Sequence, residues 1–488
     1  MLGEKALVGS FQIQASRAKE PLFYSPPAPD GMTPFPFQEA GVEYMLSRRN
    51  GLFGDAPGLG KSAECVLLGN AIEAKRTLVI CPASLRLNWE REIWAWSTLD
   101  GASTHPVIKA SDGIDKRAHF NILSYDLLRN DHIVEALMGL RWDHLILDEA
   151  HYLKDPGGNK RTKSICAPDL LPSVVGRITM ASGTILPNQP AEAYNCMRLL
   201  AWESIDRMSL ESFRKEYYGL GGGFVNKRVF DPKTRVWKYK AQWSTTVRNQ
   251  PKNLDDLQMR LRKHIMVRRL KEDVLPQLPE RLWHPFPLVA DSGIRNALKH
   301  PGWEQARKLY EMGGFVQAAV DGQISEARRL LGEAKAKHVI AYVKDMLESG
   351  VEKVVIGAWH RSVLEALREG LDSYGLVYMD GGTPLRQRQD AVDRFQGRPE
   401  VRVILGQTQV LGLGWTLTAS QDVVLAEPDW VPGVNDQLLD RVHRIGAAVG
   451  GRVIGHIPVV PGTLDERILG AAAKKDKNNY LALDKLPD

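Results

Sequence analysis

A nine-residue segment near position 60 combines glycines, a lysine and a hydroxyl side chain in a spacing typical of phosphate binding. It reads Gly54-Asp55-Ala56-Pro57-Gly58-Leu59-Gly60-Lys61-Ser62 and lies between a short apolar run and a helical pattern. The amides of such a loop and the N-terminus of the following helix can hold phosphate oxygens. We expect Lys61 to neutralise the β- and γ-phosphates of a nucleotide and Ser62 to bind magnesium.

The loop leaves two other interpretations open. The strict phosphate-loop pattern has glycine where Asp55 stands, and a dinucleotide fingerprint, G-x-G-x-x-A, also fits from Gly58 to Ala63. Lys61 inside this fingerprint favours a triphosphate over a pyrophosphate. The remaining alternative is a glycine loop that binds no ligand.

Two adjacent carboxylates, Asp148 and Glu149, follow the apolar run Leu145–Leu147. Because both this run and the phosphate loop fit strand ends of one sheet, we expect the carboxylates to lie near Lys61. Asp148 is then suited to hold magnesium through its water shell, and Glu149 to orient and deprotonate an attacking water. The alternative is a solvated acidic turn.

The elements that would position these residues form two α/β series. Short apolar runs alternate with helical patterns, which predicts mostly parallel sheets. The expected strands are 51–53, 78–81, 122–125, 145–147 and 177–180, then 354–356, 376–379, 401–405, 423–426 and 453–457. The predicted domains are a Pro-rich extended lead-in at 1–36, a first lobe at 37–275 with an insertion at about 201–257, a linker or helical insertion at 276–333, a second lobe at 334–470 and a tail at 471–488.

Composition excludes several classes of protein. Hydrophobic residues make up 43% of the 488 residues, and Lys and Arg exceed Asp and Glu by six, which by itself identifies no partner. The four cysteines form no C-x-x-C pair, so neither a zinc site nor a disulfide framework is indicated. No apolar run reaches the roughly 20 residues that a membrane span needs.

Together, Gly58-Leu59-Gly60-Lys61-Ser62 and Asp148-Glu149-Ala150-His151 resemble motifs I and II of superfamily 2 helicases, in which two RecA-like lobes close on ATP. The Swi/Snf-type group is the nearest, and its HARP-type annealing helicases are the most similar in motifs. The other resembling segments, in chain order, are Phe37-Gln38-x-x-Gly41, Leu78–Pro82, Ile122–Tyr125, Ser182-Gly183-Thr184 with Asn188, Ile265–Lys271 with Leu278-Pro279, Gly414–Ala419, Trp430-x-Pro432-Gly433 and Gln437-x-x-x-Arg441-x-x-Arg444-Ile445-Gly446.

The resemblance implies a set of site residues. Lys61, Glu149, Arg441 and Arg444 would be catalytic, and Ser62 and Asp148 would bind the metal. Contacts to ATP would come from Gln38, Asp55, Pro57, Gly58, Leu59, Gly60, Lys61, Ser62, Gly414, Arg441 and Arg444. Contacts to a DNA backbone would come from Ser84, Arg86, Ser124, Arg269, Gly382, Thr383, Thr408 and Trp415.

Arginine suits the γ-phosphate because it stays charged and binds oxygens in a planar fork. Arg441 and Arg444 are three residues apart and share one face if they are helical; the alternative is a surface pair bonded to Asp436 and Asp440. The basic segment Gln258–Lys271 has a helical pattern. It either lines the nucleic-acid track or forms a solvated face with inter-lobe packing.

The expected function is ATP-driven translocation on double-stranded or branched DNA, with ATP and Mg²⁺ and without a membrane. The alternatives are a strand-separating DNA or RNA helicase and a non-hydrolysing DNA-binding scaffold. We expect a prokaryotic or viral motor in the cytoplasm that takes specificity from a protein partner, or a nuclear protein if the source is eukaryotic.

Overall fold

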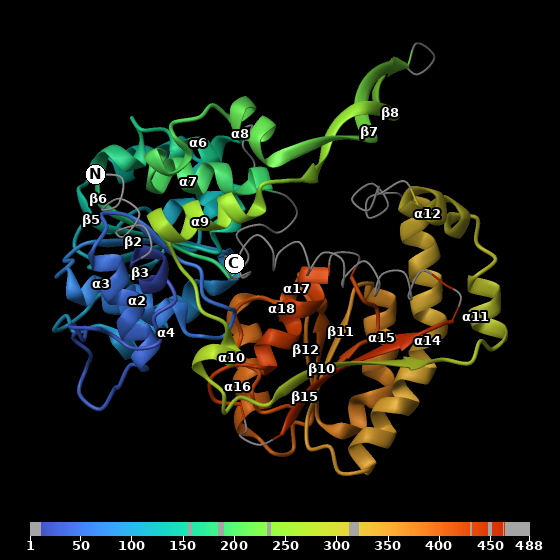
Figure 1. Ribbon diagram of the computed structural model, residues 1–488. Helices are drawn as coiled ribbons and strands as arrows, with labels where there is room; N and C mark the ends of the chain where they lie inside the picture. Colours follow the sequence, from blue (N-terminus) through green and yellow to red (C-terminus); the bar gives the residue numbers. More distant parts are fainter. Residues whose placement is uncertain are drawn as a thin grey trace. The chain divides into compact units, whose positions relative to one another are not determined.

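In the computed structural model of this chain, the described residues are 11–154, 159–183, 190–231, 236–311, 322–429, 432–447, 451–461 and 463. They divide into two compact units (Figure 1). The first unit holds the described residues of 11–217 and 253–278, and the second unit holds those of 218–252 and 279–463. Each unit contains one parallel β-sheet, as the sequence predicted.

The sheet of the first unit has seven strands in the order β3-β4-β2-β5-β6-β1-β9, and every neighbouring pair is parallel. Strands β2 and β4 are buried along their whole length, which suits their apolar runs because helices cover both faces of such a sheet. The strands are β1 (Gly51–Phe53), β2 (Thr77–Cys81), β3 (Thr104–Pro106), β4 (Phe120–Ser124), β5 (Trp142–Asp148), β6 (Val175–Ala181) and β9 (Met266–Val267).

Helices flank this sheet on both faces. In Figure 1, α2, α3 and α4 lie on one side of the strands, and α6 and α7 lie on the other. The core between sheet and helices contains Val66, Leu67 and Trp89 among its buried residues. The helices are α2 (Pro36–Leu46), α3 (Lys61–Ala71), α4 (Arg86–Trp96), α5 (Asp131–Met138), α6 (Lys160–Cys166), α7 (Tyr194–Leu200), α8 (Leu210–Tyr217), α9 (Leu254–His264) and α10 (Lys271–Val274).

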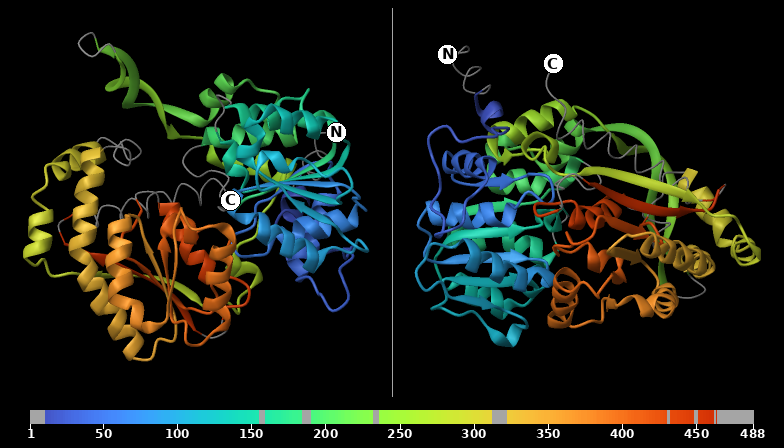
Figure 2. Two further views of the ribbon diagram at one scale, coloured as in Figure 1. Left: turned by 180° about the vertical axis from the view of Figure 1, so that it is seen from behind. Right: turned by 90° about the horizontal axis from the view of Figure 1, so that it is seen from below.

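The sheet of the second unit has six parallel strands in the order β10-β15-β14-β11-β13-β12. Helices pack against both of its faces as well (Figure 2). The strands are β10 (Glu280–Pro287), β11 (Val354–Ala358), β12 (Leu376–Met379), β13 (Val403–Gln407), β14 (Asp422–Leu425) and β15 (Arg452–Val459). The helices are α11 (Ser292–Ala297), α12 (Gly302–Glu311), α14 (Gly322–Glu348), α15 (Arg361–Leu371), α16 (Leu385–Gly397), α17 (Thr408–Leu411) and α18 (Pro432–Val442).

All ten strands expected from the sequence are present, within a few residues of their predicted bounds. Strands β3, β9 and β10 were not predicted.

The basic segment 258–271 is not one helix, which corrects the expectation: α9 ends at His264, and Met266 and Val267 then pair with Leu52 and Phe53 of β1. Tertiary pairing has overridden the helical pattern here. The domain bounds stay predictions, and the expected tail at 471–488 lies outside the described residues.

A separate two-stranded antiparallel sheet is formed by β7 (Tyr218–Asp231) and β8 (Val236–Pro251), the long green strands of Figures 1 and 2. It falls within the insertion expected at about 201–257. Its pairing is irregular between Gly219 and Gly223 and continuous from Gly223 to Asp231. Of the helices that the structure describes, none has the length and apolar character of a membrane span.

Candidate nucleotide site

The phosphate loop connects β1 to α3 and turns tightly at two glycines. Gly58 has φ 88° and Gly60 has φ 81°, a region of backbone space that residues with a Cβ rarely enter. Gly60 is the N-cap of α3, which begins at Lys61. Because the first amides of a helix lack intrahelical acceptors, this turn presents N–H groups and the positive end of the helix dipole to an anion.

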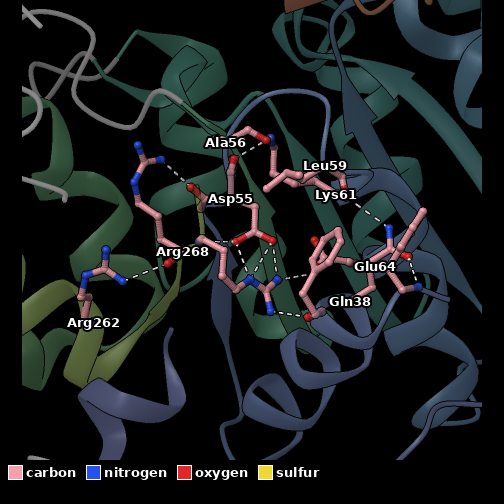
Figure 3. A network of polar contacts seen from close by, with 12 residues as sticks. Gln38, Asp55, Ala56, Leu59, Lys61, Glu64, Arg262 and Arg268 are labelled. Atoms are coloured by element: carbon pink, nitrogen blue, oxygen red, sulfur yellow. Dashed lines mark hydrogen bonds and ion pairs between the residues drawn. The ribbon is translucent and has the colours of Figure 1, made fainter. Parts of the chain in front are cut away.

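The Lys61 ammonium lies at the loop with carboxylates around it. Its Nζ donates to the carbonyl oxygens of Asp55, at 2.8 Å, and Ala56, at 3.3 Å (Figure 3). Desolvation lowers the pKa of Lys61, and the carboxylates of Glu149, Asp55, Asp148 and Glu64 oppose this shift. Phosphate oxygens are stronger acceptors than these carbonyls, since a hydrogen bond between charged partners is about twice as strong as a neutral one.

Asp148 ends β5 on the same sheet and is held in a fixed orientation. Trp89 Nε1 donates to its Oδ2 at 2.8 Å, and the Glu149 amide donates to its Oδ1 at 2.9 Å. Burial and the neighbouring Glu149 carboxylate raise the pKa of Asp148 to about 6. A cation beside it would favour the ionised form, so the position is suited to a metal ion.

Glu149 follows with φ 49°, in the left-handed region that a non-glycine residue seldom adopts. Its Oε2 lies 3.2 Å from His151 Nδ1. Strained backbone of this kind clusters at functional sites, where it aims a side chain that an ordinary strand end would place elsewhere. The geometry is consistent with a carboxylate directed at a reacting group.

The donor set fits magnesium. This ion takes oxygen ligands, usually one or two carboxylates together with substrate phosphates and water. Asp148 offers a carboxylate, and the Ser62 hydroxyl stands at the start of α3, directly after Lys61. Among the described residues, no group of three or more His, Cys, Asp and Glu could form an all-protein cage.

Asp55, expected to contact the nucleotide, instead binds Arg269 in a buried ion network. The Arg269 amide and Nε donate to Asp55 Oδ1 at 2.8 and 2.9 Å, and Arg269 Nη2 donates to Glu64 Oε1 at 2.5 Å. Further bonds join Arg269 to Asp55 Oδ2 and to the Phe37 carbonyl. The side chains of Arg269 and of both acids are at most 1% exposed.

This burial corrects the assignment of Arg269 to the DNA track, because its guanidinium is enclosed and bonded to carboxylates. The ion pairs raise the pKa of Arg269 against the desolvation that would lower it, and burial holds the pKa of Glu64 well above its usual range. Arg269 therefore connects β9, through Asp55 and Glu64, to the phosphate loop and α3.

Neighbouring Arg268 connects the loop to a second segment. Its Nη1 donates to the Gly54 carbonyl at 2.6 Å and to the Gly183 carbonyl at 3.2 Å. Gly183 lies so close to Pro57 that a Cβ at this position would come within 2.8 Å of the proline Cδ. The expected motif at 182–184 thus begins against the phosphate loop, while Thr184 and Asn188 lie outside the described residues.

Gln38 lies on α2 and is 2% exposed. Its Nε2 donates to the Leu59 carbonyl at 3.2 Å, and its Oε1 accepts from the Phe35 amide at 3.0 Å (Figure 3). Gln38 therefore holds the phosphate loop through a hydrogen bond to its backbone. Its expected contact to ATP stays a prediction.

In the second unit, both candidate arginines bind the loop that contains Gly414, whose φ is 54°. Arg441 Nε donates to the Gly412 carbonyl at 2.9 Å. Arg444 Nη1 donates to the Trp415 carbonyl at 2.9 Å and to Thr416 Oγ1 at 3.1 Å. The expectation of a shared helical face is corrected, because α18 ends at Val442 and Arg444 lies in the turn beyond it.

Asp436 and Asp440, the partners in the alternative interpretation, contact a different arginine. Arg281 Nη1 lies 3.3 Å from Asp440 Oδ1, and Arg281 Nη2 pairs with Asp436 Oδ1. Arg281 lies on β10, beside β15. The two acids therefore fasten α18 to the edge strand of the sheet.

Several expected DNA contacts are buried in structural roles. Trp415 is 2% exposed in the core of the second unit and donates from Nε1 to the Val410 carbonyl, which corrects its assignment to DNA. The Arg86 guanidinium donates to the carbonyls of Ala83, Val107 and Ile108. Thr408 Oγ1 donates to the Ala358 carbonyl at 3.4 Å.

The remaining DNA candidates differ in exposure. Ser84 and Ser124 are buried, at 7% and 4% exposure. Gly382 is exposed and Thr383 is half-buried, and the amides of both donate to Asp380 Oδ1 at 2.9 Å. These four assignments stay predictions.

Sequence reasoning did not identify Trp89, Glu64 or Arg268 as parts of the site. Trp89 is fully buried, and its indole orients Asp148. An acid on the buried side of α3, three residues after Lys61, was the signal that could have pointed to Glu64. Such an acid needs a buried cation, and Arg269 supplies it.

The fold and site define a two-unit α/β protein with a phosphate loop and an Asp-Glu pair on one sheet. Comparison with protein families agrees: the SNF2-related domain matches residues 37–285, more than half of the chain, and the helicase conserved C-terminal domain matches residues 334–446. The chain belongs to the SNF2-related family.

Curated relatives extend this finding. The SWI/SNF-related matrix-associated actin-dependent regulator of chromatin subfamily A-like protein 1 of Xenopus tropicalis is 29% identical over 92% of this chain and 46% of its own length. The DNA annealing helicase and endonuclease ZRANB3 of Bos taurus is 29% identical over 90% of this chain and 40% of its own length. The chain thus spans less than half the length of these relatives. The HARP-type resemblance is confirmed.

Among solved structures, the SWI2/SNF2 ATPase core of Sulfolobus solfataricus in complex with dsDNA aligns with 92% of this chain and 93% of that chain. The sequence identity is 19% and the TM-score is 0.42.

Proposed function

We propose that this protein is an ATP-dependent translocase on double-stranded DNA that remodels or reanneals DNA structures. The observation that carries the proposal is the gathering of Lys61, Asp148 and Glu149 at the phosphate loop, where the two carboxylates oppose the depressed pKa of the lysine. Membership of the SNF2-related family supports the choice of reaction, and similarity to ZRANB3, a DNA annealing helicase, supports the choice of substrate.

In the proposed reaction, the residues at the phosphate loop divide phosphate binding, metal binding and proton transfer among them. Lys61 and the amides at the start of α3 bind the β- and γ-phosphates of ATP. Ser62 and Asp148 would hold a magnesium ion, which neutralises charge on the phosphates. Glu149, with its constrained backbone, orients the attacking water and accepts its proton.

Arg441 and Arg444 complete the proposed site from the second unit. In the structure both donate to the loop 412–416. When ATP binds, we expect Arg444 to exchange these neutral acceptors for the charged γ-phosphate, because bonds between charged partners are stronger. Closure of the units on ATP and reopening after hydrolysis would then move the DNA-backbone contacts of one unit along the DNA relative to those of the other unit.

The proposal is tested by measuring ATP hydrolysis with duplex DNA, single-stranded DNA, forked DNA and RNA, alongside strand-displacement and annealing assays. We expect duplex DNA to stimulate hydrolysis without net strand displacement. The Glu149→Gln variant should bind ATP normally and lose nearly all hydrolysis, because it keeps the side-chain shape without a base.

Other outcomes would contradict the proposal. Net strand displacement would establish the alternative of an unwinding helicase, and stimulation by RNA alone would replace DNA as the substrate. Absence of hydrolysis with every nucleic acid would indicate a DNA-binding scaffold that has kept the fold. Normal hydrolysis by Glu149→Gln would remove Glu149 as the base.

A further inference from the structure

The amino ends of the strands in the first sheet carry concentrated positive charge. The loops that lead into β4, β2, β5 and β1 are residues 113–119, 72–76, 139–141 and 47–50. Together these loops hold seven Lys and Arg residues and two acids, Glu73 and Asp115. The acids of the candidate nucleotide site lie at the carboxyl ends of β1 and β5. The positive charge is therefore on the edge of the sheet opposite the nucleotide site.

Six of these basic residues form a row along that edge, because β4, β2, β5, β6 and β1 are neighbours in this order. Adjacent strands lie about 4.8 Å apart, so the row spans about 19 Å. Five of the six residues are exposed, and Arg76 is half-buried. Arg48, the seventh, is left out because its guanidinium lies 3.6 Å from the centre of the Tyr44 ring. We call the following set the basic row: Arg49, Lys75, Arg76, Lys116, Arg117 and Arg141.

Backbone carbonyls hold three arginines of the basic row in place. Arg76 donates from Nη1 to the Arg141 carbonyl and from Nη2 to the Lys116 carbonyl, both at 3.3 Å, and so connects the loops before β5 and β4. Arg141 Nη1 and Arg49 Nε donate to two carbonyls around the start of β6, at 2.8 and 3.2 Å. Each guanidinium has five N–H donors, so donors remain for a further acceptor.

The carboxylates beside the basic row bind backbone amides. Asp143 Oδ2 accepts from the amides of Lys75 and Arg76 at 2.9 and 2.8 Å. Asp115 Oδ1 accepts from the Arg117 amide at 2.8 Å. Within the part of the chain that the structure describes, no carboxylate forms an ion pair with a side chain of the basic row. A concentrated charge of this kind attracts a polyanion.

The surroundings of the basic row favour a nucleic acid over an acidic protein. The core of a protein interface is apolar, yet none of the large hydrophobic residues exposed in the described chain lies in these four loops. Duplex DNA carries one phosphate charge per roughly 1.7 Å of its axis, so a row of about 19 Å can meet several phosphates. Arginines that are already held in place suit such an array, because their planar fork binds two phosphate oxygens.

We infer that the basic row binds the phosphate backbone of a second arm of duplex DNA, an inference that rests on the proposed function. Strands β2 and β4 have five residues each, so about 13 Å separates the row from the DNA contacts expected at the carboxyl ends of these strands. A straight duplex against one edge of a sheet leaves the opposite edge free. The row therefore suits another arm of a branched DNA, and it would make such DNA the preferred substrate.

The test uses the full chain with three residues of the basic row neutralised together, Lys75→Gln, Lys116→Gln and Arg117→Gln. The matched control makes the same charge change at exposed positions on α6 and α8, Lys163→Gln, Arg214→Gln and Lys215→Gln. ATP hydrolysis is measured while a forked DNA, or a linear duplex with the same number of base pairs, is titrated at several salt concentrations. Each titration gives a half-saturating DNA concentration.

We expect the wild type to be half-saturated at a lower concentration of forked DNA than of linear duplex. In the row variant, this concentration should rise about tenfold for forked DNA, and its salt slope should fall by about two to three, because each lost phosphate contact removes about 0.9 from the slope. The values for linear duplex, and DNA-free hydrolysis, should be unchanged. The control variant should match the wild type, as should Lys75→Arg with Lys116→Arg, which keeps the charge.

Two outcomes would overturn the inference and leave the proposed function standing: an equal loss in the row and control variants, or an equal loss with linear and forked DNA. A wild type that shows no preference for the fork, and is inhibited by polyglutamate only while the basic row is intact, would replace DNA with an acidic protein as the partner. Hydrolysis that no DNA stimulates would instead contradict the proposed function itself.

Discussion

At the scale of single residues, the site depends on a charge network beneath the phosphate loop. Arg269 is fully buried between Asp55, in the loop, and Glu64, on α3. Neither acid is placed to touch phosphate through its carboxylate, since both bind the guanidinium. A buried charge is tolerated only when it is paired and hydrogen-bonded, so each member of this network requires the others.

The first prediction concerns Arg269→Met. We expect a loss of about 3–5 kcal/mol in the free energy of unfolding of the first unit, because Asp55 and Glu64 would stay buried without a cation. Chemical denaturation monitored by fluorescence measures this loss. Arg129→Met is the control: Arg129 pairs with Asp126 on the surface, where the side chains are 62% and 64% exposed, and such pairs contribute at most about 1 kcal/mol.

Equal, small losses in the Arg269→Met and Arg129→Met variants would show that the buried network is not a stabilising requirement. Arg269→Lys separates charge from geometry. A lysine keeps the cation but lacks the planar fork that reaches two carboxylates at once, so we expect an intermediate loss.

At the scale of elements, the network sets how closely α2 and α3 approach. Gly41 of α2 faces the ion pair directly: a Cβ there would lie 2.5 Å from Glu64 Oε1 and 2.7 Å from Arg269 Nη2. Gln38, one turn earlier on α2, donates to the phosphate loop. The helix thus contacts both the loop and the charges that hold it.

The second prediction follows from this close approach. Gly41→Ala should lower the melting temperature and weaken ATP binding, because the added methyl would displace the buried, mutually bonded ends of Glu64 and Arg269. The control is Gly397→Ala at the end of α16, where a Cβ would meet nothing within 4 Å. That change should be neutral or stabilise by up to about 1 kcal/mol. A Gly41→Ala variant as stable as Gly397→Ala would contradict the prediction.

Sequence reasoning located the phosphate loop, the Asp-Glu pair and all ten expected strands because these features are local. It assigned Arg269 to DNA because an arginine in a basic run gives no sign of burial. The acids that enclose it, Asp55 and Glu64, stand more than 200 residues earlier. Strand β9 has only two residues, Met266 and Val267, and is defined by its pairing with β1. Such features exist only after the chain has folded.

At the scale of the whole molecule, the two units divide the proposed reaction. In the proposal, the first unit would supply the phosphate loop and the carboxylates, and the second would supply Arg441 and Arg444. The SNF2-related domain and the helicase conserved C-terminal domain match these two parts in turn. If hydrolysis needs residues of both units, a substitution in the second unit should reduce turnover without impairing nucleotide binding by the loop of the first unit.

The last prediction tests this division with Arg444→Ala. Arginines that contact the transferred phosphoryl group contribute about 10³-fold or more to turnover and much less to ground-state binding. We therefore expect kcat to fall by about three orders of magnitude while the Kd for ATP changes by less than about threefold. Single-turnover hydrolysis and a fluorescent nucleotide titration measure the two quantities.

Arg394→Ala is the matched control in the same unit, since Arg394 pairs with Asp390 at 3.9 Å on the surface, where the side chains are 43% and 68% exposed. Arg444 also donates to the Trp415 carbonyl, so loosening of the loop 412–416 is a competing cause of any loss. Arg444→Lys distinguishes the two causes. A lysine can still bond the carbonyl, but it cannot reproduce the planar contact to phosphate oxygens, so kcat should remain low. Turnover restored by lysine would show that Arg444 acts by holding the loop and does not touch the nucleotide.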